Sequence, residues 1–217
     1  MLTRRSGNPS VILLVVCSVL VTSCTSRSQH ERPESIGIIT HSAGFPTVIR
    51  MNQTYILAVQ ARIYEGDIVE TDEVSKLHIQ MSDETVFSLG PNSHFVLHEF
   101  KYTPFTRAPI ARLSLTDGTL RTQTANMMKE RRSSFQIKTP LAVIDVTSGD
   151  FLIDYQQENT LQVAMATGTG ILVSNNNGAV NIVEHRYGTT IIGHSAPQTP
   201  KIWPERRIND AFYSLGF

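Results

Sequence analysis

From Gly37 to about residue 199, apolar and polar residues alternate in short runs that glycine, asparagine, aspartate or proline separate. Typical runs are TVIRM, KLHIQM, TVFSL, FLIDY and GILVS. A period of two with many Val, Ile, Thr and Phe residues is the pattern of strands that bury one face. After residue 36 only Thr124–Arg132 and the C-terminal RINDAFYSL favour short helices. The sequence therefore predicts an all-β domain over residues 37–199, built as a sandwich, a barrel-like roll or a short β-helix, and a C-terminal tail over residues 200–217.

Three short segments between apolar runs predict hairpin turns. The first is Asp83-Glu84, the second is Asp117-Gly118, and the third is the Asn-rich NNNG at Asn175–Gly178. Asp-Gly is a preferred pair for a type I′ turn, so the second segment is the strongest of the three signals.

The N-terminus has the features of a secretory signal. Two arginines, Arg4 and Arg5, precede the apolar run Val11–Val21, which is too short to span a bilayer as a helix. The following VTSC ends at Cys24 and resembles the lipobox of bacterial lipoproteins. That resemblance implies a signal peptide over residues 1–23, a diacylated Cys24 and, because Thr25 follows, an outer-membrane anchor facing the periplasm. An ordinary signal peptide with a chance cysteine and an uncleaved anchor are the alternatives.

Charge and cysteine content narrow the classes of protein further. The chain has 19 basic and 19 acidic residues, so no overall field favours nucleic acid. Residues 24–36 are polar up to the final isoleucine and predict a flexible tether. Of the two cysteines, Cys17 would leave with the signal peptide and Cys24 would carry lipid, so the mature chain is expected to have no disulfide and no thiol nucleophile.

A longer pattern resembles the FecR domain. The positions that carry the likeness are Gly66, Asp67, Val69, Thr71, Leu77, Asp83, Thr85, Leu89, Gly90, Pro91, Asn92 and Ser93, and it continues through Ala111–Thr124 and Phe135–Tyr155. Two departures stand out: Glu84 occupies a turn position where the family has glycine, and IDVTSGDF lacks the family's Gly-x-Arg-Gly-Thr.

The resemblance implies an envelope-exposed β-module. The family's best-known members are membrane-spanning regulators that pass a signal from an outer-membrane transporter to a cytoplasmic sigma factor. They need a cytoplasmic helix bundle and a transmembrane helix, whereas only ten residues precede the apolar run here. We therefore expect the β-module alone, tethered by lipid.

The clustered His94, His98 and Glu99 raise the question of a metal or acid–base site. The run HFVLHEF alternates like a strand, in which residues four apart are separated by about 13 Å. That distance is too long for two histidines to share one ion. The pattern therefore favours two histidines on a strand surface.

The other polar motifs favour structural roles. GPNS, at residues 90–93, is typical of a turn that enters a strand, and Ser148 lacks a nucleophile motif. The acidic trio Asp145, Asp150 and Asp154 lacks the spacing of a calcium loop. We expect no metal, no cofactor and no catalytic residue.

The densest basic run, KERR, is a hypothetical partner contact through Lys129, Arg131 and Arg132, next to two methionines. The sequence as a whole predicts a non-enzymatic envelope lipoprotein that binds a protein partner, with exposed strand edges available for pairing. A small-molecule ligand is not expected. The alternatives are a carbohydrate-binding or enzymatic envelope domain, and a signal transducer of the sigma-regulator type.

Overall fold

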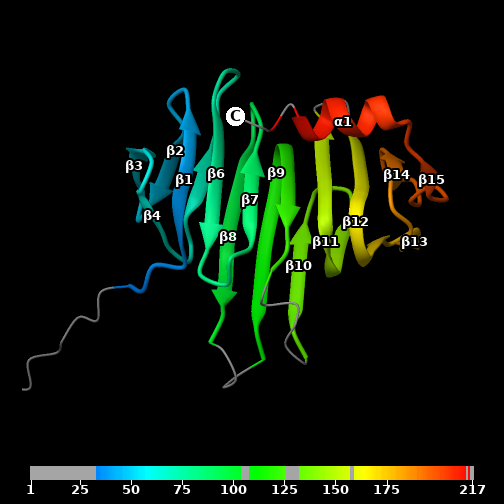
Figure 1. Cartoon of the computed structure of the whole chain (residues 1–217), viewed down its shortest axis with the longest axis horizontal. Helices are drawn as coiled ribbons and strands as arrows, with labels where there is room; N and C mark the ends of the chain where they lie inside the picture. Colours follow the sequence, from blue (N-terminus) through cyan, green and yellow to red (C-terminus); the bar gives the residue numbers. More distant parts are fainter. Residues whose placement is uncertain (1–32, 104–107, 126–131, 157–158, 214, 216–217) are drawn as a thin grey trace, which may run out of the picture. The chain divides into compact units, whose positions relative to one another are not determined.

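The computed structural model describes residues 33–103, 108–125, 132–156, 159–213 and 215. The chain divides into two units, residues 1–32 and 33–217, and the described residues all belong to the second. This unit is an all-β fold with one short helix near its C-terminus, which confirms the predicted fold class (Figure 1). The predicted signal peptide and most of the predicted tether lie outside the described residues.

The strands form one sheet, and all but one pair of neighbours in the described part are antiparallel. In chain order the elements are β1 Gly37–Ala43, β2 Thr47–Arg50, β3 Gln53–Ile56, β4 Arg62–Ile63, β5 Ile68–Glu70, β6 Lys76–Met81, β7 Val86–Leu89, β8 His94–Lys101, β9 Ile110–Gln123, β10 Ser134–Lys138, β11 Val143–Gln156, β12 Thr160–Asn175, β13 Gly178–Ile182, β14 Tyr187–Ile192, β15 Lys201–Ile202 and α1 Glu205–Tyr213. The parallel pair is β9 with β10.

The sheet folds into two layers because three long strands run through both of them. Residues 110–117 of β9 pair with β8, and residues 118–123 pair with β7 and β11. One layer, which we call the helix layer, therefore has the order β4-β1-β6-β7-β9-β11-β12-β14-β15. The opposite layer has the order β3-β2-β5-β8-β9-β10-β11-β12-β13. The result is a sandwich whose layers share β9, β11 and β12, with β3 and β4 at one end of the view in Figure 1 and β13 to β15 at the other.

The predicted hairpin at Asp117-Gly118 is wrong. β9 continues through both residues, and the chain bends there from one layer into the other instead of reversing. Gly118 has a φ of +84°, which fits the bend, and the Ser93 side chain lies against it. The Asp-Gly pair favours a left-handed backbone conformation at the glycine. That conformation occurs at bends within a strand as well as at hairpin turns.

The other two predicted hairpins are confirmed. β6 and β7 pair antiparallel from Leu77↔Leu89 to Gln80↔Val86, and β12 and β13 close at Asn175↔Gly178. In the first turn Glu84 lies at φ +73°, in the left-handed region where the family pattern has glycine.

Replacing Glu84 with glycine is expected to raise the free energy of unfolding by about 0.5–1 kcal/mol, because the left-handed conformation is strained for a residue with a Cβ atom. The Glu84→Ala variant is the control, since it removes the same side-chain contacts but keeps the Cβ atom. Urea unfolding of both variants measures the difference. A glycine variant no more stable than the alanine variant would show that the turn stores no strain.

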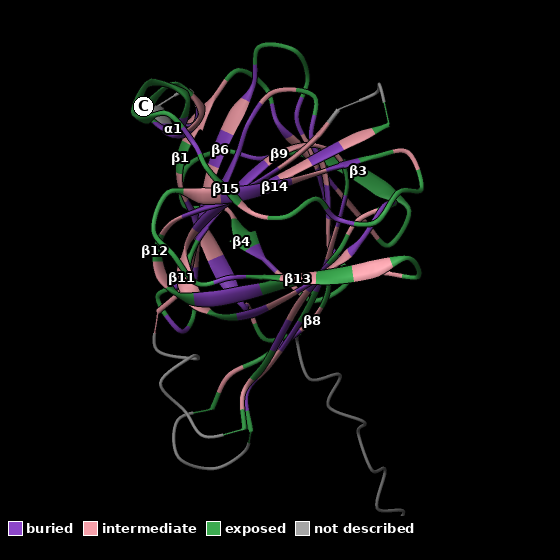
Figure 2. Cartoon of the chain, turned by 90° about the vertical axis from the view of Figure 1, so that its right-hand side faces the viewer, coloured by how far each residue is buried: buried purple, intermediate pink, exposed green. Residues whose placement is uncertain are grey.

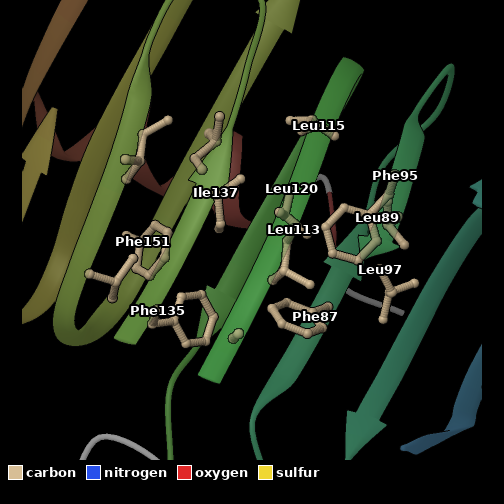
Figure 3. Packing of buried hydrophobic residues seen from close by; sticks show 14 of the residues in the cluster. Phe87, Leu89, Phe95, Leu97, Leu113, Leu115, Leu120, Phe135, Ile137 and Phe151 are labelled. Carbon is tan, nitrogen blue, oxygen red and sulfur yellow. The ribbon is translucent and has the colours of Figure 1, made fainter. Parts of the chain in front are cut away.

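The core lies between the two layers. Phe87 on the helix layer contacts Phe95 and Phe135 on the opposite layer, with ring centroids 5.3 Å and 6.2 Å apart (Figure 3). All three side chains are almost fully buried. Aromatic pairs at these distances contribute beyond their buried area, so this contact holds the layers in register.

The second helix predicted from the sequence is confirmed. α1 lies across β11 and β12 on the outer face of the helix layer (Figure 1). Its Ile208 and Phe212 pack with Trp203 against Leu152 and Ala164 in a second, smaller apolar cluster. The C-terminal segment is therefore a packed cover on the sheet.

Candidate protein-docking surface

Asp67, in the Gly-Asp step of the family pattern, is a fully buried structural carboxylate. It accepts hydrogen bonds from Arg50 Nε at 2.7 Å and Arg50 Nη2 at 2.6 Å, and from the Tyr64 backbone N–H at 2.8 Å. The hydrogen bond to this carboxylate raises the pKa of Arg50 above its ordinary value. The network links β2 to the turn before β5. Both carboxylate oxygens of Asp67 accept hydrogen bonds from within the fold.

The GPNS motif is confirmed as a turn that enters a strand, β8. Ser93 Oγ donates to the Gly90 carbonyl at 2.8 Å and accepts from the Thr119 backbone N–H at 3.0 Å. Thr71 Oγ1 also donates to the Gly90 carbonyl, at 2.6 Å, and accepts from the Ser93 N–H. These bonds hold the bend of β9 in place.

His94 and His98 lie on the surface of β8, each with a neighbouring hydroxyl. His94 Nδ1 is 2.6 Å from Thr116 Oγ1, and His98 Nε2 is 2.8 Å from Ser114 Oγ. Across the described part of the chain, no group of three His, Cys, Asp or Glu side chains has the arrangement of a metal site.

The acidic trio of β11 is spread along that strand, and each carboxylate has a partner of its own. Asp145 accepts from Gln136 Nε2 at 2.8 Å, and Asp154 accepts from Thr119 Oγ1 at 2.8 Å. Asp150 forms a two-bond ion pair with Arg121 at 2.8 and 2.6 Å.

A groove of about 540 Å³ lies between α1 and the sheet. Its wall includes Trp203, but the Arg207 guanidinium lies over the indole, 3.7 Å from the ring centroid. Arg207 also donates to Gln162 Oε1 at 2.7 Å. The indole face is therefore covered and does not offer a stacking platform for a sugar.

His78 connects β6 to the C-terminal cover. Its Nε2 lies 2.9 Å from the Leu215 carbonyl, and its ring meets His41 edge-on with centroids 5.3 Å apart. Burial is the main cause that lowers the pKa of His78, and the charges of His41 and Arg121 act in the same direction, while the Leu215 carbonyl opposes them.

This lowered pKa predicts that acid destabilises the fold. In the folded state His78 stays neutral to a lower pH than in the unfolded state, so the unfolded chain binds the proton first as pH falls below the ordinary histidine pKa of about 6.5. The free energy of unfolding should therefore fall between pH 7 and pH 5. The His78→Gln variant, which cannot titrate, should show a shallower fall when both proteins are unfolded in urea at each pH. Parallel curves would exclude His78 as the cause.

The residues predicted for lipidation and partner contact lie mostly outside the described part. Cys24, Lys129 and Arg131 belong to residues that the structure does not describe, and they stay predictions. Arg132 is described, and it is exposed with a φ of +66°. The structure does not bring it together with another predicted site residue.

Around β2 and β3 lies a group of exposed large apolar side chains for which the sequence predicted no site. Ile56 is 67% exposed, Phe45 72%, Met51 86% and Tyr55 47%. Figure 2 shows β3 in green because all four of its residues are exposed. The signal in the sequence was the uncharged run MNQTYILAV at residues 51–59, which follows the β2 run without a glycine or proline turn.

β3 is an edge strand, since it pairs with β2 and with no other strand in the described part. The β2–β3 turn consists of Met51 and Asn52, both at positive φ, as a type I′ turn requires. A left-handed methionine with an exposed side chain is an uncommon choice, because glycine, asparagine and aspartate are preferred there. We call residues 45–59, together with the unpaired edge of β3, the β3 strip. Exposed apolar surface of this kind marks contact sites for other proteins.

No helix in the described residues is both long and apolar enough to cross a membrane.

Comparison with known proteins gives a family for the central part of the chain. Residues 67–169 match the family described as FecR protein. No curated protein matches the sequence. Two crystal structures of a candidate anti-sigma factor from Parabacteroides distasonis ATCC 8503 share the fold, each with a TM-score of 0.53 and 14% identity over 65% of this chain and 62% of theirs.

The present chain thus spans less than two thirds of those structures. The family match includes the Asp67 network, the GPNS turn and the strands that link the two layers, whereas the β3 strip precedes it. The chain therefore contains a FecR domain over residues 67–169.

Proposed function

We propose that this chain is a non-enzymatic lipoprotein of the cell envelope, anchored through Cys24, whose FecR domain acts as a signalling or scaffold module by binding another envelope protein. The β3 strip is the docking surface. The observation that carries this proposal is the uncovered edge of β3 with its exposed apolar side chains.

The arrangement of the polar residues supports a binding role over a catalytic one. The motif residues Asp67, Thr71 and Ser93 are buried and bonded within the fold. Their hydrogen bonds position strands, and the strip is the surface that we propose for contact with another protein. Edge strands bind partners through backbone hydrogen bonds, with side chains supplying specificity.

A photo-crosslinking amino acid at Ile56 of the full chain tests the docking surface in cells. We expect a crosslinked protein, identified by mass spectrometry, because Ile56 lies in the strip. The same amino acid at Ile192, which is 58% exposed on β14, is the matched control. The proposal fails if position 56 captures nothing or captures the same background proteins as position 192.

Labelling with a fatty acid tests the anchor separately. The natural chain should incorporate labelled palmitate and fractionate with membranes, and the Cys24→Ala variant should lose both properties. Equal labelling of the two chains would contradict lipidation at Cys24.

A further inference from the structure

We propose that the protein bound at the β3 strip is a second copy of this chain, joined by antiparallel pairing of the two β3 strands about a two-fold axis at Tyr55. This inference rests on the proposed function, because it names the occupant of the same surface. It is independent of the lipid anchor.

The hairpin register determines which backbone groups of β3 face outward. In a two-residue hairpin the two residues that close the turn, here Arg50 and Gln53, form a hydrogen-bonded pair. Along the two strands, hydrogen-bonded pairs then alternate with pairs that are not hydrogen-bonded. The Leu57 N–H donates to the Pro46 carbonyl at 2.7 Å, which continues the alternation past the end of β3. Gln53, Tyr55 and Leu57 therefore bond toward β2. The N–H and C=O groups of Thr54 and Ile56 point along the open edge.

Two open edges of this kind match each other in one symmetric register. With Tyr55 opposite Tyr55 of the second copy, Thr54 of each chain lies opposite Ile56 of the other. Both Thr54–Ile56 pairs can then exchange N–H and C=O bonds, and the two tyrosines form the non-bonded pair whose side chains are closer together. A two-fold axis is the usual symmetry of a protein dimer.

The charges of the strip favour this occupant. Residues 51–59 contain no charged side chain, so two copies meet without like-charge repulsion, and a charged partner strand would gain no ion pair from β3. Two other edges of the described sheet are guarded. β4 and β15 have only two residues each and carry Arg62 and Lys201. Proteins protect edges by such devices, and β3 has none of them.

The apolar side chains fit the same arrangement. Tyr55 pairs across the hairpin with Val48, which is 1% exposed, so both lie on the core side of the opposite layer. A cross-chain tyrosine pair would extend the core from one copy into the other. Ile56, on the other side of the strand, would lose exposed apolar area to the neighbouring strand.

Single-cysteine crosslinking tests the register in the full chain with Cys17 and Cys24 replaced by serine. Tyr55→Cys should form a disulfide-linked dimer under mild oxidation, since side chains in a non-bonded pair lie about 4.5–5.5 Å apart at Cβ. Thr54→Cys is the matched control, because the two Thr54 positions would be offset by two residues and about 7–8 Å apart. Equal crosslinking at both positions, or none at position 55, would overturn the inference.

Thr54→Pro tests the backbone bonds without a thiol. The Thr54 N–H points away from β2, so proline is tolerated in the hairpin as on other edge strands, but it removes a donor to the second copy. Light scattering of the full chain in mild detergent should show the dissociation constant of the dimer raised about tenfold or more, with an unchanged thermal transition of the monomer. An unchanged dissociation constant would overturn the inference.

The outcomes separate this inference from the proposed function. A monomer that crosslinks through Ile56 to a different protein overturns the second copy and leaves the docking surface in place. A monomer that crosslinks to nothing through Ile56 overturns both.

Discussion

The Gly118→Ala variant is expected to lose about 2–5 kcal/mol of unfolding free energy. A Cβ atom at this position would lie 2.3 Å from Ser93 Oγ and 2.4 Å from Ser93 Cα, so the backbone of the GPNS turn would have to move. The φ of +84° adds strain of its own. The estimate combines about 1–2 kcal/mol for the left-handed conformation with about 1–3 kcal/mol for overpacking.

Gly66→Ala is the matched control for this prediction. Gly66 has nearly the same φ, +83°, but a Cβ atom there would meet nothing within 4 Å. The Gly66→Ala variant should therefore lose only about 1–2 kcal/mol of unfolding free energy, which is the cost of the left-handed conformation alone. Urea unfolding at one pH measures both variants. Equal losses would mean that the close approach of Ser93 to the bend of β9 contributes nothing.

Removing the buried carboxylate of Asp67 is the second large effect. Asp67→Ala is expected to cost about 3 kcal/mol, because it leaves the Arg50 guanidinium and the Tyr64 N–H without their acceptor in a buried site. The measurement is again the free energy of unfolding in urea.

Asp150→Ala provides the comparison at a more exposed pair. Asp150 also binds an arginine through two bonds, but its side chain is 18% exposed, whereas that of Asp67 is 0% exposed. Since water can replace a partner at an exposed site, the expected loss is only about 1 kcal/mol. If Asp150→Ala were the more damaging change, burial would not be what makes the Gly-Asp step important.

These predictions give the residues of the family's sequence pattern a role in stabilising the fold and not in a chemical reaction. Asp67 links β2 to the turn before β5 through its hydrogen bonds with Arg50. Ser93 stabilises the bend of β9 by accepting a hydrogen bond from the Thr119 N–H. Function then depends on what the surface around this framework presents. In the described part of this chain, the strip at β3 combines exposed apolar side chains with an open strand edge.

The sequence by itself determined the strand content, two of the hairpins and the C-terminal helix. These features follow from local causes, since alternation, turn chemistry and helical periodicity act over a few residues. The likeness to the FecR domain also came from local motifs, and the match over residues 67–169 confirmed it.

Only the tertiary structure decided how the strands connect. The runs ARLSL and TLRTQ looked like two strands around an Asp-Gly turn, but they are one strand, β9, that serves both layers. Whether a left-handed glycine reverses the chain or bends it depends on which strands lie on each side, and those pairings join residues far apart in the sequence. The open edge of β3 likewise results from strand pairings between residues far apart in the sequence. The apolar run that begins at Tyr55 indicates a strand, while the place of β3 at the end of the sheet is determined by the pairing of the other strands.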